Sequence, residues 1–120
     1  MLLLAGSAAA DQSPGEGMAR GLLPGGEIVG KGWTVQWMHT ATDKSAITDE
    51  FDDRVYMRCG KKTTIMIWRR VARVRGGRDY DVKAWERAPG TVFVEVRACK
   101  EGVCAETLAS KTVVLQKECK

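Results

Sequence analysis

Apolar and polar residues alternate along most of the chain after residue 32, a pattern typical of strands that bury one face. Residues 92–98 carry the clearest alternation, with three valines and an alanine on one side. Strands are predicted over 33–38, 55–59, 63–68, 80–84, 92–98, 103–106 and 112–116. This series predicts an all-β fold of about seven strands, either an antiparallel sandwich of the immunoglobulin or fibronectin III kind or a small barrel.

Turn residues separate the predicted strands. Pro89-Gly90 suits the centre of a type II turn, and Gly76-Gly77 is a strong hairpin signal. Only 106–111 offers a helical pattern, and it is short and weak. Residues 11–32 hold seven glycines and two prolines, which predicts a flexible leader. We therefore expect a single β domain over residues 33–120.

Composition places the chain among single-domain proteins with a hydrophobic core. It has 120 residues, of which 44% are hydrophobic and 28% charged. No run approaches the roughly 20 apolar residues of a spanning helix, so we expect no membrane insertion of the mature chain. Residues 1–10 are apolar and end in Ala8-x-Ala10, like the tail of a secretory signal peptide. This predicts a secreted or periplasmic protein; the alternative is a cytosolic protein with an apolar tail.

The four cysteines are an even number in a small chain of predicted export, which favours disulfides. Cys99 and Cys104 flank a predicted hairpin turn over 100–103, so they should pair. Cys59 and Cys119 then pair by elimination. The rival interpretation is a zinc site, but the spacing lacks the paired C-x2-C pattern, so no metal site is predicted.

Basic residues are concentrated between Arg54 and Arg78, where nine cations are uninterrupted by any acid although the net charge is only +4. On one sheet face they would form a positive surface for an acidic protein, an anionic polymer or nucleic acid. The candidate ligand-binding residues are Tyr56, Arg58, Trp68, Arg69, Arg70, Arg73 and Arg75. The plainer interpretation is a solvated strand face, with arginines that protect a sheet edge.

Other residues of possible function are less informative. Trp37 is expected in the core, whereas Trp68 and Trp85 could be exposed. The single histidine, His39, is expected to be a surface or hydrogen-bonded residue, and it excludes sites built on two histidines. The carboxylates within 43–53 could hold calcium but match no EF-hand loop, and a solvated loop is the simpler interpretation.

Two stretches resemble known families. Residues 89–98, Pro-Gly-Thr-Val-Phe-Val-Glu-Val-Arg-Ala, resemble the late-strand region of fibronectin type III domains. Residues 44–50, 55–59 and 63–67 are similar to exported accessory proteins of bacterial type VI secretion, which place Ser-x-x-Thr-Asp before an Arg-Cys strand and a Thr-rich strand. Both resemblances imply an exported all-β module that binds something.

The sequence thus predicts an exported, non-enzymatic binding module that recognises a protein or an envelope polymer through the basic segment. No nucleophile and base pair can be argued, so no catalytic residue and no cofactor is predicted. The alternative is a cytosolic nucleic-acid-binding β-barrel with the same basic strip and four free thiols. The oligomeric state is left open.

Overall fold

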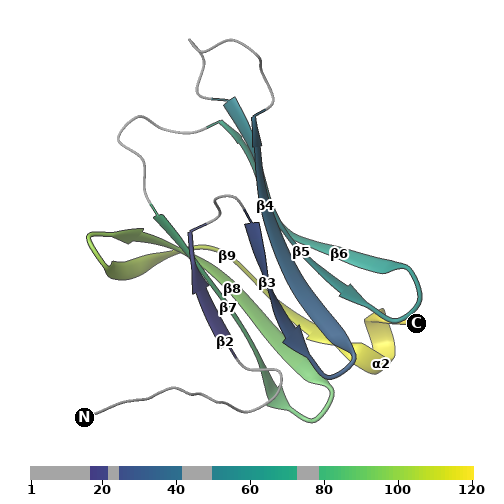
Figure 1. The fold of residues 1–120 in the computed structure, drawn as a ribbon. Coiled ribbons are helices and arrows are strands. Elements are labelled where there is room, and N and C mark those ends of the chain that lie inside the picture. Colours follow the sequence, from purple (N-terminus) through teal and green to yellow (C-terminus); the bar gives the residue numbers. More distant parts are fainter. Residues whose placement is uncertain (1–16, 22–24, 42–49, 73–78) are drawn as a thin grey trace.

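The computed structural model describes residues 17–21, 25–41, 50–72 and 79–120, which form an antiparallel β-sandwich. One sheet has the order β3-β4-β5-β6 and the other the order β2-β7-β8-β9 (Figure 1). The strands are β2 Gly17–Arg20, β3 Gly25–Gly30, β4 Trp33–Ala41, β5 Glu50–Cys59, β6 Thr63–Ala72, β7 Asp79–Ala88, β8 Thr91–Lys100 and β9 Val103–Val114. A single helical turn, α2 Leu115–Glu118, follows β9. The predicted all-β sandwich is confirmed.

The core lies between the two sheets and is built from the alternating apolar positions. Val35, Val55 and Met57 face inward from one sheet, and Val82, Val94 and Val96 from the other, all without exposed surface. Burying each such side chain contributes about 1.5–3 kcal/mol. Trp37 is 6% exposed, as its place in the pattern predicted. The residues of β8 that face the core are therefore the apolar ones of the alternating pattern.

The folded region begins before Trp33, contrary to the predicted leader over 11–32. β2 pairs with β7, and β3 pairs with β4. Gly26 and Gly30 lie directly opposite Trp37 and Trp33, and a Cβ at these glycines would come within 2.4 and 2.0 Å of the indole rings. The glycines therefore make room for buried tryptophans, a role that composition alone could not distinguish from flexibility. The predicted signal-peptide residues lie outside the described residues.

The last strand is longer than predicted. β9 is continuous from Val103 to Val114, so the two predicted strands are one. The short, weak helical pattern over 106–111 lies within this strand. Register shifts interrupt its pairing with β8 next to Val96 and Cys99. Each shift breaks the two-residue period, which hid the strand from a search for strict alternation.

The turns that the structure describes and both disulfides agree with the predictions from the sequence. Gly90 has a φ of 77°, as the centre of a Pro-Gly turn requires. Glu101 and Gly102 have φ values of 52° and 85° and close the β8–β9 hairpin. Both predicted disulfides are present, Cys99–Cys104 and Cys59–Cys119. The predicted turn at Gly76-Gly77 lies outside the described residues.

Candidate binding surface

The outer face of the β3–β6 sheet carries the basic residues in two of three cross-strand rows. The residue pairing places Met38, Arg54 and Arg69 in one row, and Gln36, Tyr56 and Met66 in the next. A third row holds Thr34, Arg58 and Thr64. We call the six large side chains of these rows the Arg–Met face: Met38, Arg54, Tyr56, Arg58, Met66 and Arg69.

The apolar members of the Arg–Met face are unusually accessible. Met38 is 37% exposed and Met66 is 46% exposed, and Tyr56 is partly exposed between them. Protein interfaces are enriched in tyrosine, methionine and arginine and depleted in lysine. The face combines those three residue types on adjoining strands, where each can contact the same partner.

Asp52 organises two of the arginines. Its Oδ2 lies 2.6 Å from Nη2 of Arg54, and its Oδ1 accepts a hydrogen bond of 3.1 Å from Nε of Arg69. The hydrogen bond from Arg54 holds the pKa of Asp52 below its ordinary value, against an opposing effect of burial and with help from Arg69. Asp52 in turn raises the pKa of Arg54. The pairs restrain both guanidinium groups while leaving 39% of the Arg54 side chain and 53% of the Arg69 side chain exposed.

Arg58 is differently placed, with its guanidinium 5.8 Å from the ring centroid of Tyr56. A cation over an aromatic ring is attracted by the ring quadrupole. No ion pair involves Arg58 among the described residues. Its charge is therefore available to an external carboxylate.

Two predicted binding residues point the other way, into the space between the sheets. The Trp68 ring lies 5.1 Å from the Tyr80 ring and packs against the core. Nη1 of Arg70 donates a hydrogen bond of 2.6 Å to the Tyr80 hydroxyl. The cause is a register shift in β6: Met66 is opposite Tyr56, but Trp68 is opposite Val55. One extra residue reverses the faces, so the basic segment does not form one surface.

The remaining predicted binding residues and the residues that the prediction missed complete the comparison. Arg73 and Arg75 lie outside the described residues. Arg54 belongs to the predicted basic segment but was not singled out there, and Met38 and Met66 were missed. The sequence did hold a signal for the methionines: in the alternating pattern they occupy positions that face outward and usually carry polar residues.

The two aspartates of β5, Asp52 and Asp53, have different surroundings. Asp52 faces the arginines, whereas Asp53 is fully buried and its Oδ1 lies 2.5 Å from Nδ1 of His39. The His39 ring also stacks on Phe51 at 4.3 Å between centroids, which fits the predicted hydrogen-bonded histidine. Asp52 and Asp53 therefore have different partners. The other carboxylates of 43–53 lie outside the described side chains.

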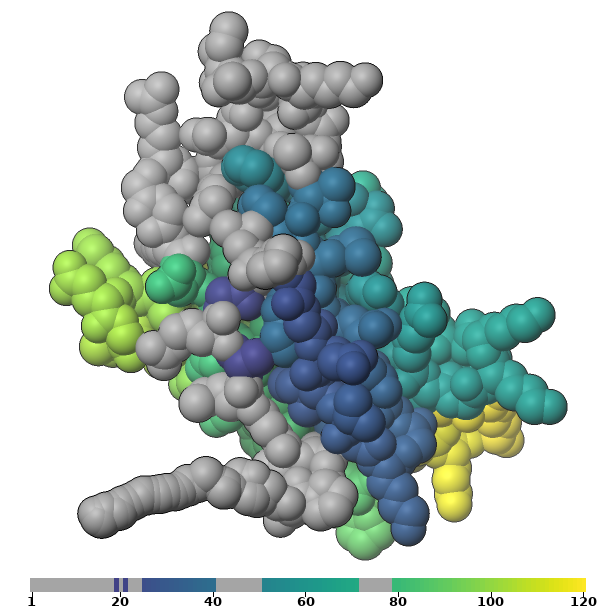
Figure 2. All heavy atoms as spheres, in the orientation of Figure 1, coloured from purple at the N-terminus to yellow at the C-terminus, as the bar shows by residue number. Residues whose placement is uncertain are grey.

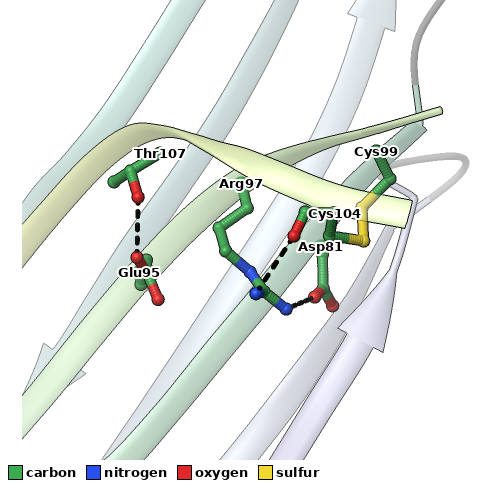
Figure 3. Close-up of polar contacts among 6 residues, drawn as sticks. All are labelled: Asp81, Glu95, Arg97, Cys99, Cys104 and Thr107. Atoms are coloured by element: carbon green, nitrogen blue, oxygen red, sulfur yellow. Dashed lines mark hydrogen bonds and ion pairs between the residues drawn. A yellow bond between two sulfur atoms is a disulfide. The ribbon is translucent and has the colours of Figure 1, made fainter. Parts of the chain in front are cut away.

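Part of the outer face of the second sheet is occupied by contacts among its own side chains. Arg97 forms an ion pair with buried Asp81 and donates to the Cys104 carbonyl at 3.4 Å, beside the Cys99–Cys104 disulfide (Figure 3). Asp81 and the two sulfurs are close enough to hold a metal, but disulfide sulfurs are not thiolates and do not serve as such ligands. These contacts link β7, β8 and β9 across the sheet.

Trp85 belongs to the same outer face. It meets Phe93 edge to face at 5.0 Å, and the Arg87 guanidinium covers the Phe93 ring at 3.9 Å. The ammonium of Lys83 lies 5.0 Å from the Trp85 ring. These aromatic rings already have cationic partners, unlike the open methionines of the Arg–Met face.

No protein-family model, curated protein or solved structure matches the chain. Among the described residues, no helix has the length and apolar character to cross a membrane. The two disulfides indicate an oxidising environment outside the reducing cytosol. They are contrary to the free thiols that the cytosolic nucleic-acid alternative requires.

Proposed function

We propose that the chain is an exported, non-enzymatic binding module that captures a protein with an acidic surface through the Arg–Met face. The observation that carries this proposal is the open arrangement of Met38, Tyr56 and Met66 between arginines on neighbouring strands. Exposed apolar side chains supply contact area that is gained only when a partner excludes water.

The arginines supply specificity in this proposal. A guanidinium can hold a carboxylate with two parallel hydrogen bonds, which fixes geometry as well as charge. Arg58 is the first candidate for such a bond because its charge has no ion-pair partner among the described residues. Arg54 and Arg69 are already restrained by Asp52, so they lose less conformational freedom when a partner binds.

A site-specific photocrosslinker tests this function in cells that make and export the protein. Placed at Met66, it should form an adduct with one protein, and the same group at Thr112, exposed on the other sheet, should not. Arg58→Glu in the Met66-labelled chain should abolish the adduct by like-charge repulsion. Arg87→Glu, which places the same charge change on the other sheet, should leave the adduct unchanged.

Equal adducts from both label positions, or an adduct insensitive to Arg58→Glu, would reject the Arg–Met face as the binding site. Loss of the adduct with both charge reversals would show that net charge alone drives the association. Thermal unfolding of each variant verifies that the fold is intact.

A further inference from the structure

Lysines from three distant segments gather at one end of the sandwich. The turn between β3 and β4 carries Lys31, the turn between β5 and β6 carries Lys61 and Lys62, and the C-terminal segment carries Lys117 and Lys120. All five are exposed. We call this group the lysine end: Lys31, Lys61, Lys62, Lys117 and Lys120.

The pairing of the strands brings the two turns together. Trp33 is opposite Cys59, and Cys59 is opposite Thr63, so the β3–β4 and β5–β6 turns lie at the same end of the sheet. The Cys59–Cys119 disulfide then fastens the C-terminal segment beneath them. The Thr63 hydroxyl donates a hydrogen bond of 3.0 Å to the Lys120 carbonyl, which holds the same contact.

The figures agree with this arrangement. Both turns lie at the same end of the sandwich as α2 and the C-terminal residues (Figure 1). In Figure 2 the teal side chains of the β5–β6 region and the yellow C-terminal residues project next to each other at the right of the molecule. The charges therefore stand on projecting turns and do not converge on one point.

Two acidic residues among those described lie near the lysine end, Glu118 and Glu86. Glu118 is partly buried, and its Oε2 accepts a hydrogen bond of 3.0 Å from the Val114 amide. Glu86, on β7 near the Pro89-Gly90 turn, is followed directly by Arg87. These two carboxylates stand against five lysines, so the named charges of this end sum to a positive value.

We propose that the lysine end binds the surface of an anionic lipid bilayer. Lysine is a hydrated point charge on a flexible stem, suited to a diffuse layer of phosphate groups, whereas protein interfaces are depleted in lysine. Projecting turns can meet a flat surface together.

The proposal is independent of the Arg–Met face and gives that face an orientation. The strands run away from the lysine end. When that end is bound to a bilayer, the strands therefore point away from the membrane surface. The Arg–Met face then remains open to a partner at the side.

Cosedimentation of the full chain with vesicles tests the proposal. Vesicles of phosphatidylglycerol and phosphatidylcholine in equal parts should bind the protein, and phosphatidylcholine alone should not. Each lysine near such a surface contributes about 1 kcal/mol, or about fivefold in affinity, so Lys61→Gln with Lys62→Gln should weaken binding about 25-fold. The matched control, Lys100→Gln with Lys111→Gln, changes net charge equally at exposed positions elsewhere and should have little effect.

Several outcomes would overturn the proposal. The first is failure to bind the anionic vesicles, and the second is an equal loss in the control variant, which would mean that only net charge matters. A third is loss of vesicle binding in Met66→Ser with Arg69→Glu, which would move the contact to the Arg–Met face. A fourth is preferential binding to single-stranded DNA over vesicles, lost in the Lys61 and Lys62 variant, which would assign the end to nucleic acid.

Discussion

Neighbouring residues of the same chemical type have opposite environments in β5. Asp52 is next to exposed arginines, whereas Asp53 is completely buried beside His39. A charged side chain is tolerated in either place only because a partner compensates the loss of water. The effect of each carboxylate on the stability of the fold therefore depends more on its partner than on the residue type.

Asp52 should make the stability of the protein depend on acid. Its pKa is lowered from 3.8 in the folded chain, so its charge stabilises the fold above that value. The contribution is lost as the pH falls through the lowered pKa, because the folded and unfolded chains are then both protonated. Asp52→Asn should cost up to about 1 kcal/mol at neutral pH, a modest value because both arginines are partly exposed.

Urea unfolding of the wild type and of Asp52→Asn, at neutral pH and at about pH 2.5, measures this dependence. The stability difference between the two proteins should be smaller at the acidic pH, because Asp52 of the folded wild type is then at least partly protonated. A difference that stays constant between the two pH values would mean that the Asp52 charge is not its source.

The two disulfides differ as elements of the fold. Cys99–Cys104 joins neighbouring residues of the β8–β9 hairpin across a separation of 5, whereas Cys59–Cys119 spans a separation of 60. The hairpin is already closed by its turn, but the C-terminal segment depends on the longer link for its place under β5 and β6. The second bridge therefore constrains far more of the unfolded chain.

Removing the bridges one at a time should reveal this difference. In the chain-entropy model, Cys59→Ala with Cys119→Ala loses about 4 kcal/mol and Cys99→Ala with Cys104→Ala about 2 kcal/mol. Guanidinium unfolding of both double variants and of the oxidised wild type gives the two losses. A larger loss for the hairpin bridge would show that packing around Cys99 outweighs loop closure.

The molecule as a whole is closed by its N-terminal strands. β2 extends one sheet and β3 the other, and the two strands lie beside each other at one edge of the sandwich. Ile28 of β3 is 7% exposed and belongs to the core. The sandwich therefore depends on residues whose composition suggested a leader.

Truncation tests this dependence. A chain that starts at Trp33 loses both strands and exposes the edges of β4 and β7, which invites aggregation. It should be less stable than a chain that starts at Gly17 by about 3 kcal/mol or more, since the burial of Ile28 and the pairing of two strands are lost. Thermal unfolding and size-exclusion chromatography compare the two chains; equal stability would restore Trp33 as the domain boundary.

Local patterns in the sequence were enough to determine the β class, most strand positions, the Pro89-Gly90 turn and both disulfides. Alternation and turn chemistry act between residues close in the chain, so they can be read without knowing which strands pair. Tertiary structure alone decided that Gly26 and Gly30 accommodate tryptophans, and that a register shift turns Trp68 inward and Met66 outward. It also decided that Lys31, Lys61 and Lys117 lie at the same end of the sandwich. These features depend on hydrogen bonding and packing between strands distant in sequence, where one extra residue exchanges the faces of a sheet.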